Sequence, residues 1–222
     1  MTVTSFYPDA DPESTSVDGL AQQTTNANWD TMRAAGGTGH NDTAPSRPVF
    51  ITSAGAPTWG GFGRLLFLYD TSSIGGDSIA SAVNDYTASS GPLFNDDFTD
   101  SLSLVASAPA SNTEVINGDF DTLGTTKFAT ADVALSGITH DDETPFRFTL
   151  NAAGLAAIDG GGITKFGIRT LRDLADNEPS GSSADEQTIV YIHQAEETVS
   201  GDQRPVLTVT HSPSFTPKAI MF

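Results

Sequence analysis

The most apolar stretch of the chain runs from Phe62 to Asp70, where hydrophobic residues are nearly continuous instead of alternating with polar ones. An antiparallel strand that is covered on one face only should alternate, so this run predicts a central strand that is covered on both faces. The second cover is either a loop of the same chain or a neighbouring subunit, and we expect the loop. Within this strand, Leu65 and Phe67 or their neighbours should be fully buried.

Shorter segments show the period of two that is typical of half-buried strands. In residues 145–150 this pattern places Phe146, Phe148 and Leu150 on the inner face. The other predicted strands cover residues 2–7, 14–22, 47–53, 78–86, 101–106, 164–172, 187–193 and 205–210. One short helix is expected over 152–158, with Asn151 as its N-cap and a glycine run after it.

The spacing of these segments, together with 21 Gly and 12 Pro, predicts an all-β chain with many turns. We expect a β-sandwich of two antiparallel sheets with roughly ten to twelve strands. The polar, glycine-rich residues 36–46 are expected to form an exposed loop. Residues 1–211 are predicted to form one domain, and residues 212–222 an extended tail with the apolar end Ile220, Met221 and Phe222.

The net charge of -18, from 28 acidic and 10 basic residues, changes the list of plausible partners. A surface this negative repels phosphate backbones and anionic lipid heads, so we expect neither nucleic acid nor membrane partners. The chain has no Cys, which excludes disulfides and thiolate chemistry. Its N-terminus has neither a basic region nor an apolar core of a signal peptide, so we expect no ordinary export.

Several segments, in their order along the chain, resemble one known domain type. These segments are Arg64–Ile74 with Asp77–Val83, Phe148–Asn151 with Gly154–Ile158, and Arg204–His211. They resemble the core of DNRLRE-type domains, jelly-roll-like sandwiches that are similar to carbohydrate-binding modules and occur in bacterial and phage surface proteins. The resemblance covers residues 60–211, although Asn84-Asp85-Tyr86 and His211 depart from the family pattern. It implies a jelly-roll-like sandwich and a role in adhesion, decoration or glycan binding.

The opening segment adds a second resemblance. Tyr7-Pro8-Asp9 together with Val17-Asp18-Gly19 is similar to stand-alone versions of this domain in phage structural gene clusters. This similarity implies a place on a virion surface, with an extracellular or cell-surface location as the alternative. A viral structural protein also reconciles an outward-facing role with the missing signal peptide.

Candidate metal ligands are concentrated in one polar segment. Asp173, Asp176, Asn177 and Glu178 follow a predicted strand and bring four oxygen-bearing side chains into one turn. Calcium takes six or more oxygen ligands, so this turn is the candidate calcium site, although an ordinary polar turn is the favoured interpretation. The acidic groups at 96–100 and 141–143 are expected to be solvated loops, and the four histidines lack zinc-site spacing.

Three aromatic residues are candidates for stacking on sugar rings, namely Trp29, Trp59 and Tyr86. Trp59 stands in a Gly/Pro-rich segment, where it either faces solvent or folds back over the core. No catalytic motif appears, so we expect a protein without enzymatic activity. Two functions stay open: a virion structural protein that decorates or cements a particle as a homo-oligomer on a capsid, and a module that binds a surface glycan.

Overall fold

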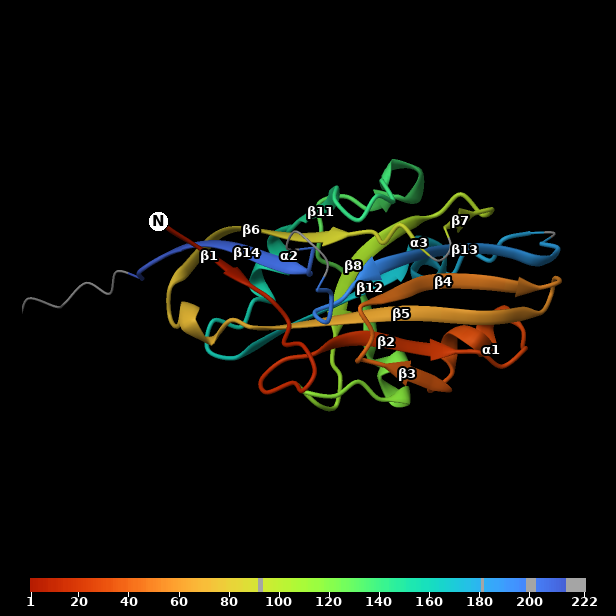
Figure 1. The fold of residues 1–222 in the computed structure, drawn as a ribbon, viewed down its shortest axis with the longest axis horizontal. Coiled ribbons are helices and arrows are strands. Elements are labelled where there is room, and N and C mark those ends of the chain that lie inside the picture. The colour runs from red at the N-terminus through yellow and green to blue at the C-terminus, as the bar shows by residue number, and fades with distance from the viewer. Residues whose placement is uncertain (92–93, 181, 199–202, 215–222) are drawn as a thin grey trace, which may run out of the picture.

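The computed structural model describes residues 1–91, 94–180, 182–198 and 203–214, and its strands form two antiparallel sheets (Figure 1). The smaller sheet has the order β1 (Thr2–Phe6), β14 (Val206–Ser212), β6 (Ser78–Thr87) and β11 (Pro145–Thr149). The larger sheet runs through β10 (Val133–Ala134), β8 (Ser101–Ser107), β12 (Ile163–Thr170), β5 (Trp59–Asp70), β4 (Ser46–Ala54), β13 (Ala184–His193) and β7 (Asn95–Asp96). Three further strands branch from it: β2 (Asp18–Gln23) pairs with β5, β3 (Gly39–Asn41) with β2, and β9 (Leu123–Lys127) with β8. The predicted all-β sandwich of two antiparallel sheets is confirmed.

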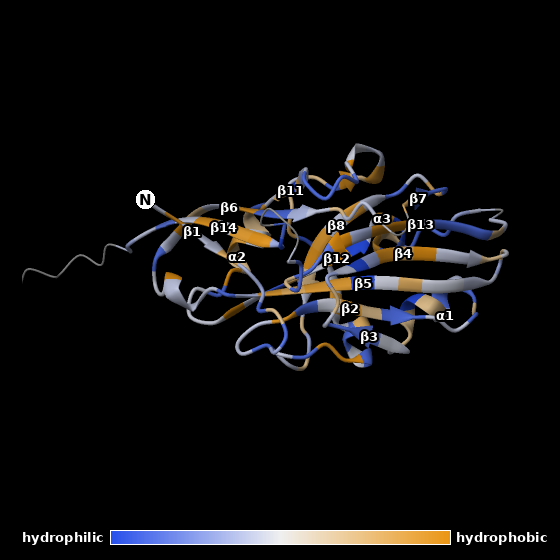
Figure 2. Cartoon of the chain, in the orientation of Figure 1, coloured by the Kyte–Doolittle hydropathy of each residue, from blue (hydrophilic) through white to orange (hydrophobic). Residues whose placement is uncertain are grey.

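Strand β5 is the centre of the larger sheet, as its apolar run predicted. One of its edges pairs with β2, and the other pairs with β12 along residues 65–70 and with β4 along residues 59–63. Every residue from Leu65 to Tyr69 has an exposed fraction of 0%. Figure 2 shows one half of the same strand as a hydrophobic band, whereas its other half is mostly pale.

Both faces of β5 are covered by the same chain. Leu65, Phe67 and Tyr69 belong to the hydrophobic cluster between the two sheets. Leu66 and Leu68 belong to a second cluster, to which Met32 and Phe120 contribute from outside the sandwich. These residues come from helix α1 (Trp29–Ala34) and the 3₁₀ turn η2 (Asn117–Thr122). The same chain therefore covers the second face, as expected, but with a helix and a 3₁₀ turn in place of the predicted loop.

The single predicted helix exists as α2 (Ala152–Ala156), and the Asn151 side chain accepts a hydrogen bond from the backbone N–H of Gly154 at 2.9 Å. Two further α-helices were not predicted: α1, and α3 (Leu171–Ala175). Both have a side-chain cap, because Asn28 accepts from the N–H of Thr31 and Thr170 accepts from the N–H of Asp173. The strand predicted to reach residue 172 therefore ends at Thr170. The remaining 3₁₀ turns are η1 (Ser72–Ile74) and η3 (Leu135–Gly137).

The segment 36–46 is not wholly a loop, which corrects the sequence prediction. Its residues Gly39–Asn41 form β3 and pair with β2. Just before this strand, Gly37 has φ +77, and a Cβ there would lie 2.1 Å from the carbonyl oxygen of Asn117. A glycine is required at this position, because the chain turns sharply against η2. Among the described residues, no helix has the length and hydropathy that a membrane crossing requires.

Candidate functional site

The predicted calcium ligand Asp173 is the centre of a buried ion-pair cluster. Its carboxylate accepts from Arg64 (Nε to Oδ2 2.8 Å, Nη2 to Oδ1 2.8 Å) and from Arg169 (Nε to Oδ2 2.9 Å, Nη2 to Oδ1 2.8 Å). A third guanidinium, that of Arg33, lies 3.5 Å from Oδ1. Two bidentate arginines use the acceptor sites that a cation would need.

The fold explains why three arginines meet one carboxylate. Arg64 comes from β5 and Arg169 from the adjacent β12, while Asp173 lies in the first turn of α3. Burial alone would raise the pKa of Asp173, but Arg64 and Arg169 outweigh it and hold this pKa below its usual value. Arg64 also lies 3.8 Å above the ring centroid of Phe120 and donates to the carbonyl oxygen of Phe120 at 2.7 Å. The cluster therefore fastens α3, α1 and η2 to the outer face of the large sheet.

Two of the other predicted calcium ligands, Asp176 and Glu178, also accept hydrogen bonds from protein donors. Asp176 accepts from the indole Nε1 of Trp29 at 2.9 Å and pairs with Arg33 at 2.6 Å. Glu178 accepts from the indole Nε1 of Trp59 at 2.7 Å. Within the described part of the chain, no three acidic or histidine side chains are arranged to hold a metal ion. The calcium prediction for Asp173, Asp176, Asn177 and Glu178 is wrong, because arginine and tryptophan donors hold the carboxylates of Asp173, Asp176 and Glu178, and Asn177 alone cannot bind the ion.

The aromatic glycan candidates lie in the interior. The exposed fractions are 3% for Trp29 and 0% for Trp59 and Tyr86. The two indole rings pack edge to face with centroids 4.9 Å apart, and the Tyr86 hydroxyl accepts from the side-chain amide of Asn84 at 2.7 Å. A buried ring has no face on which a sugar can stack, so the prediction of these three residues as a glycan platform is wrong.

The two acidic groups differ in their surroundings. Asp141 is exposed, and hydrogen bonds from the backbone N–H and hydroxyl of Thr144 lower its pKa to about 2. Asp100 was predicted to lie in a solvated loop, but it is buried, with an exposed fraction of 5%. Burial raises the pKa of Asp100.

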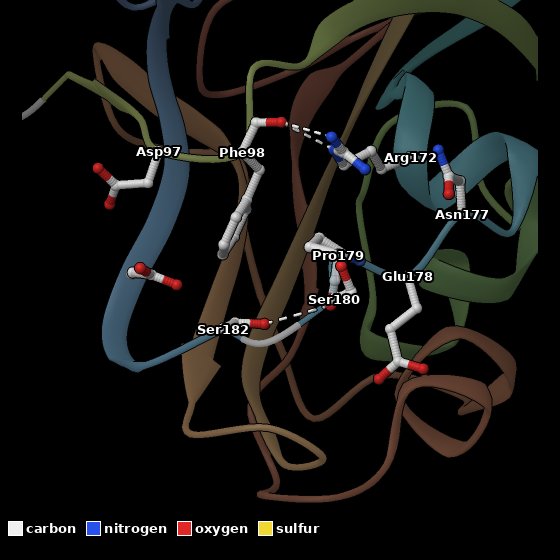
Figure 3. A pocket seen from close by; sticks show the side chains of 9 residues that line it. Asp97, Phe98, Arg172, Asn177, Glu178, Pro179, Ser180 and Ser182 are labelled. Carbon is white, nitrogen blue, oxygen red and sulfur yellow. Dashed lines mark hydrogen bonds between the residues drawn. The ribbon is translucent and has the colours of Figure 1, made fainter.

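Asp100 borders a polar cleft at the end of the large sheet. A cavity of about 360 Å³ lies between Phe98, residues 177–180, Ser182 and Glu186 (Figure 3). A second cavity of about 210 Å³ is lined by Asp100, Ser101 and α3. Arg172 and Asn177 line both cavities, so the two cavities are neighbours. In Figure 3, the Arg172 guanidinium points toward the Phe98 carbonyl oxygen, to which it donates at 2.6 Å through Nη2.

The outer face of the small sheet is the second notable surface. Strand pairing aligns Ser5, Thr208, Val83 and Thr149 in one row across the four strands. Their chain neighbours Phe6, Leu207 and Phe148 are buried, so the row points away from the core. Parallel rows add Val3, Thr210 and Ser81 on one side, and Val206, Asp85 and Arg147 on the other.

This outer face carries almost no net charge. Among its outward-pointing residues, the charged ones are Asp85 and Arg147, and Arg147 donates to both carboxylate oxygens of Asp85 at 2.6 and 2.7 Å. The two opposite charges therefore cancel. The edge strand β1 has no charged residue and no proline, and Val3 on it has an exposed fraction of 65%. The chain as a whole has a net charge of -18, so the lack of net charge on this face and on the β1 edge is unusual for its surface.

The fold and these surfaces define the protein as an all-β sandwich with a polar cleft and a nearly uncharged sheet face. No protein-family model matches the chain, and no curated protein matches it. The resemblance to DNRLRE-type domains therefore stays a prediction. The predicted assembly residues Ile220, Met221 and Phe222 lie outside the described residues, so the division into a domain over 1–211 and a tail also stays a prediction.

Proposed function

We propose that the protein is a non-enzymatic structural β-sandwich that decorates or cements a particle surface, and that the outer face of its small sheet meets a second copy of the chain. The observation that carries the proposal is the uncharged character of this face in an otherwise acidic molecule. Two copies repel each other at most orientations, and the repulsion is weakest where neither presents net charge.

The side chains of this face can form hydrogen bonds with the same side chains of a second copy. Hydroxyl groups both donate and accept hydrogen bonds, so Ser5, Thr208 and Thr149 can pair with the same residues of another copy. A twofold axis that passes close to the Asp85–Arg147 pair would bring Asp85 of one copy toward Arg147 of the other. Within the described residues β1 pairs with β14 alone, and its other edge extends the same uncharged surface. This edge lacks the charges and prolines that commonly protect sheet edges.

The size of the face sets the strength of the contact. Four strands spaced about 4.8 Å apart, with roughly five residues of ~3.4 Å each, give a footprint of roughly 300 Å². A stable protein interface buries about 800 Å² on each partner. The sheet face alone should therefore give a weak dimer, and many copies on a regular particle would be held by their combined contacts. As the setting we propose a phage virion, with a bacterial cell surface as the alternative.

The test is the oligomeric state measured by sedimentation over a range of protein and salt concentrations. We expect self-association that strengthens as salt is raised, because salt screens the repulsion between the acidic surfaces. Val3→Glu and Thr149→Glu each place a new charge on the face of both partners and should abolish association. Thr125→Glu, at an exposed position of β9, is the matched control and should leave it unchanged.

A chain that stays monomeric at all concentrations and salts would overturn the proposal. Association that is equally strong in Val3→Glu, Thr149→Glu and Thr125→Glu would also overturn it, because the contact would then lie elsewhere.

A further inference from the structure

We infer that β1 also pairs, edge to edge and antiparallel, with β1 of a second copy, so that two four-stranded sheets join into one sheet of eight strands. β1 stands at the end of the small sheet, and within the described residues it pairs with β14 alone (Figure 1). The edge pairing rests on the proposed function for its partner, but it uses the backbone edge of β1 instead of the sheet face.

The first observation is that β1 is unprotected, whereas the other outermost strands among the described residues have features that hinder pairing. β7 and β10 are two residues long, and β3 is three residues long. β9 contains Lys127 and pairs with β8 through a register shift. β11, at the opposite end of the small sheet, contains Pro145 and Arg147. β1 has five residues, no charged side chain and no proline, so a further strand can add most easily at this edge.

The second observation is the regular geometry of β1. Its five residues pair one to one with β14, from Thr2 with His211 to Phe6 with Leu207, without a bulge. In an antiparallel strand, backbone N–H and C=O groups point alternately to the two edges, so those that do not face β14 are aligned along the other edge. A second β1 offers the same row of donors and acceptors, and the two rows can therefore satisfy each other.

The length and composition of the strand favour a register that is centred on Thr4. A twofold axis perpendicular to the sheet then places Thr2 opposite Phe6 of the second copy, and Val3 opposite Ser5. This register pairs all five residues, which no other register does. No like charges meet, because β1 has no charged side chain. Val3, with an exposed fraction of 65%, gains a neighbour across the joint, and this removes apolar surface from water.

The side chain of Thr4 lies on the inner side of the sheet. Thr4 pairs with Val209, whose exposed fraction is 0%, so both side chains point toward the core. The Thr4 hydroxyl also lies 2.9 Å from Nε2 of His211. A contact between two outer faces therefore cannot bring the Thr4 side chains of two copies together, whereas the edge pairing places them directly opposite each other.

The area of the joined sheet makes the two contacts interdependent. One ladder of five residues is weak on its own, because isolated pairs of strands are marginally stable in water. The outer faces of the two joined copies lie on the same side, however, and present roughly 600 Å², twice the area of one sheet. This area approaches the roughly 800 Å² that a stable interface buries on each partner. Two such pairs, packed face to face about a second twofold axis, form a tetramer with D2 symmetry.

The experiment is disulfide trapping, which suits this chain because it has no Cys of its own. In Thr4→Cys, the two Cα atoms lie about 4.5–5.5 Å apart across the joint, within the range of a disulfide. In the matched control Thr2→Cys, on the same side of the same strand, the two Cα atoms lie about 14 Å apart along the strand. Mild oxidation and non-reducing electrophoresis should give at least severalfold more dimer for Thr4→Cys than for Thr2→Cys. Melting curves establish whether both variants fold.

Hydrogen exchange of the wild type gives a second measurement, which needs no variant. As the protein concentration is raised, amides of residues 2–6 should exchange several times more slowly, because those at the edge of the sheet become hydrogen-bonded. Amides of β11, the opposite edge strand, should exchange at rates that do not depend on concentration.

A Thr4→Cys chain that folds but gives no more dimer than Thr2→Cys would overturn the inference, as would exchange rates in β1 that do not depend on concentration. Self-association in sedimentation together with either result would leave the sheet-face contact standing and remove only the edge pairing. Conversely, Thr4→Cys dimers in a chain whose association is insensitive to Thr149→Glu would support the edge pairing and overturn the face contact.

Discussion

The Asp173 cluster allows the sharpest test of how this sandwich is held together. Asp173→Asn keeps the shape of the side chain but removes the negative charge between Arg64 and Arg169. The exposed fractions of these two arginines are 2% and 4%, so neither can turn to water for compensation. In addition, the new amide N–H₂ would face guanidinium donors where the carboxylate accepted from them.

The magnitude follows from the burial of the cluster. Removing one partner of a buried ion pair leaves an uncompensated charge and typically costs about 3–5 kcal/mol. For a chain of this size, each kcal/mol lowers the melting temperature by roughly 2–4 °C. Asp173→Asn should therefore lower the melting temperature by roughly 6–20 °C. Urea unfolding followed by circular dichroism gives the free energy of unfolding directly.

The matched control is Asp132→Asn, which weakens the surface pair between Lys127 Nζ and Asp132 Oδ2 at 2.7 Å. The Lys127 side chain is 42% exposed, and surface pairs contribute about 0–1 kcal/mol, so this variant should stay close to the wild type. Equal losses in the two variants would refute the reasoning that burial makes the Asp173 cluster strong. A chelator should leave the melting curve unchanged, and a chelator-dependent loss of stability would restore the calcium hypothesis for this segment.

Three further predictions address the core, the acidic interior and the tail. Leu66→Asp places a charge in the fully buried outer cluster and should cost several kcal/mol, seen as loss of soluble expression or a large drop in melting temperature. The pKa of Asp18 lies well above its ordinary value of 3.8, because of burial first and then the charges of Glu196 and Glu13. The fold therefore favours the protonated form of Asp18. The stability that this gives to the folded state is fully present below about pH 4 and is lost as the pH rises through the raised pKa. Asp18→Asn should therefore be more stable than the wild type at pH 8 and should lose this advantage at pH 4; a melting-temperature difference that does not change with pH would contradict the prediction. Deletion of residues 215–222 should leave the melting temperature unchanged but weaken association in sedimentation, whereas association at full strength would show that the tail is not an anchor.

The sequence by itself determined the class of fold and the position of the central strand. Apolar residues at a period of two indicate which side of a strand is buried, because neighbouring side chains point to opposite faces. The unbroken run from Leu65 to Tyr69 could therefore be interpreted without knowing any partner. The helix after Asn151 was also predictable, because a cap and its helix lie within a few residues of each other.

The roles of individual polar and aromatic residues were decided only by the tertiary structure. Asp173 is part of an oxygen-rich segment in the sequence, and it becomes an ion-pair centre only when Arg64, 109 positions earlier, joins Arg169, four positions earlier. Trp59 stands in a Gly/Pro-rich segment that is typical of exposed loops, yet its indole donates to Glu178, 119 positions later. Hydrophobic periodicity reports whether a position is buried, but the function of a charged or amphipathic side chain depends on the partner it meets. That partner is chosen by the pairing of distant strands, which no local pattern records.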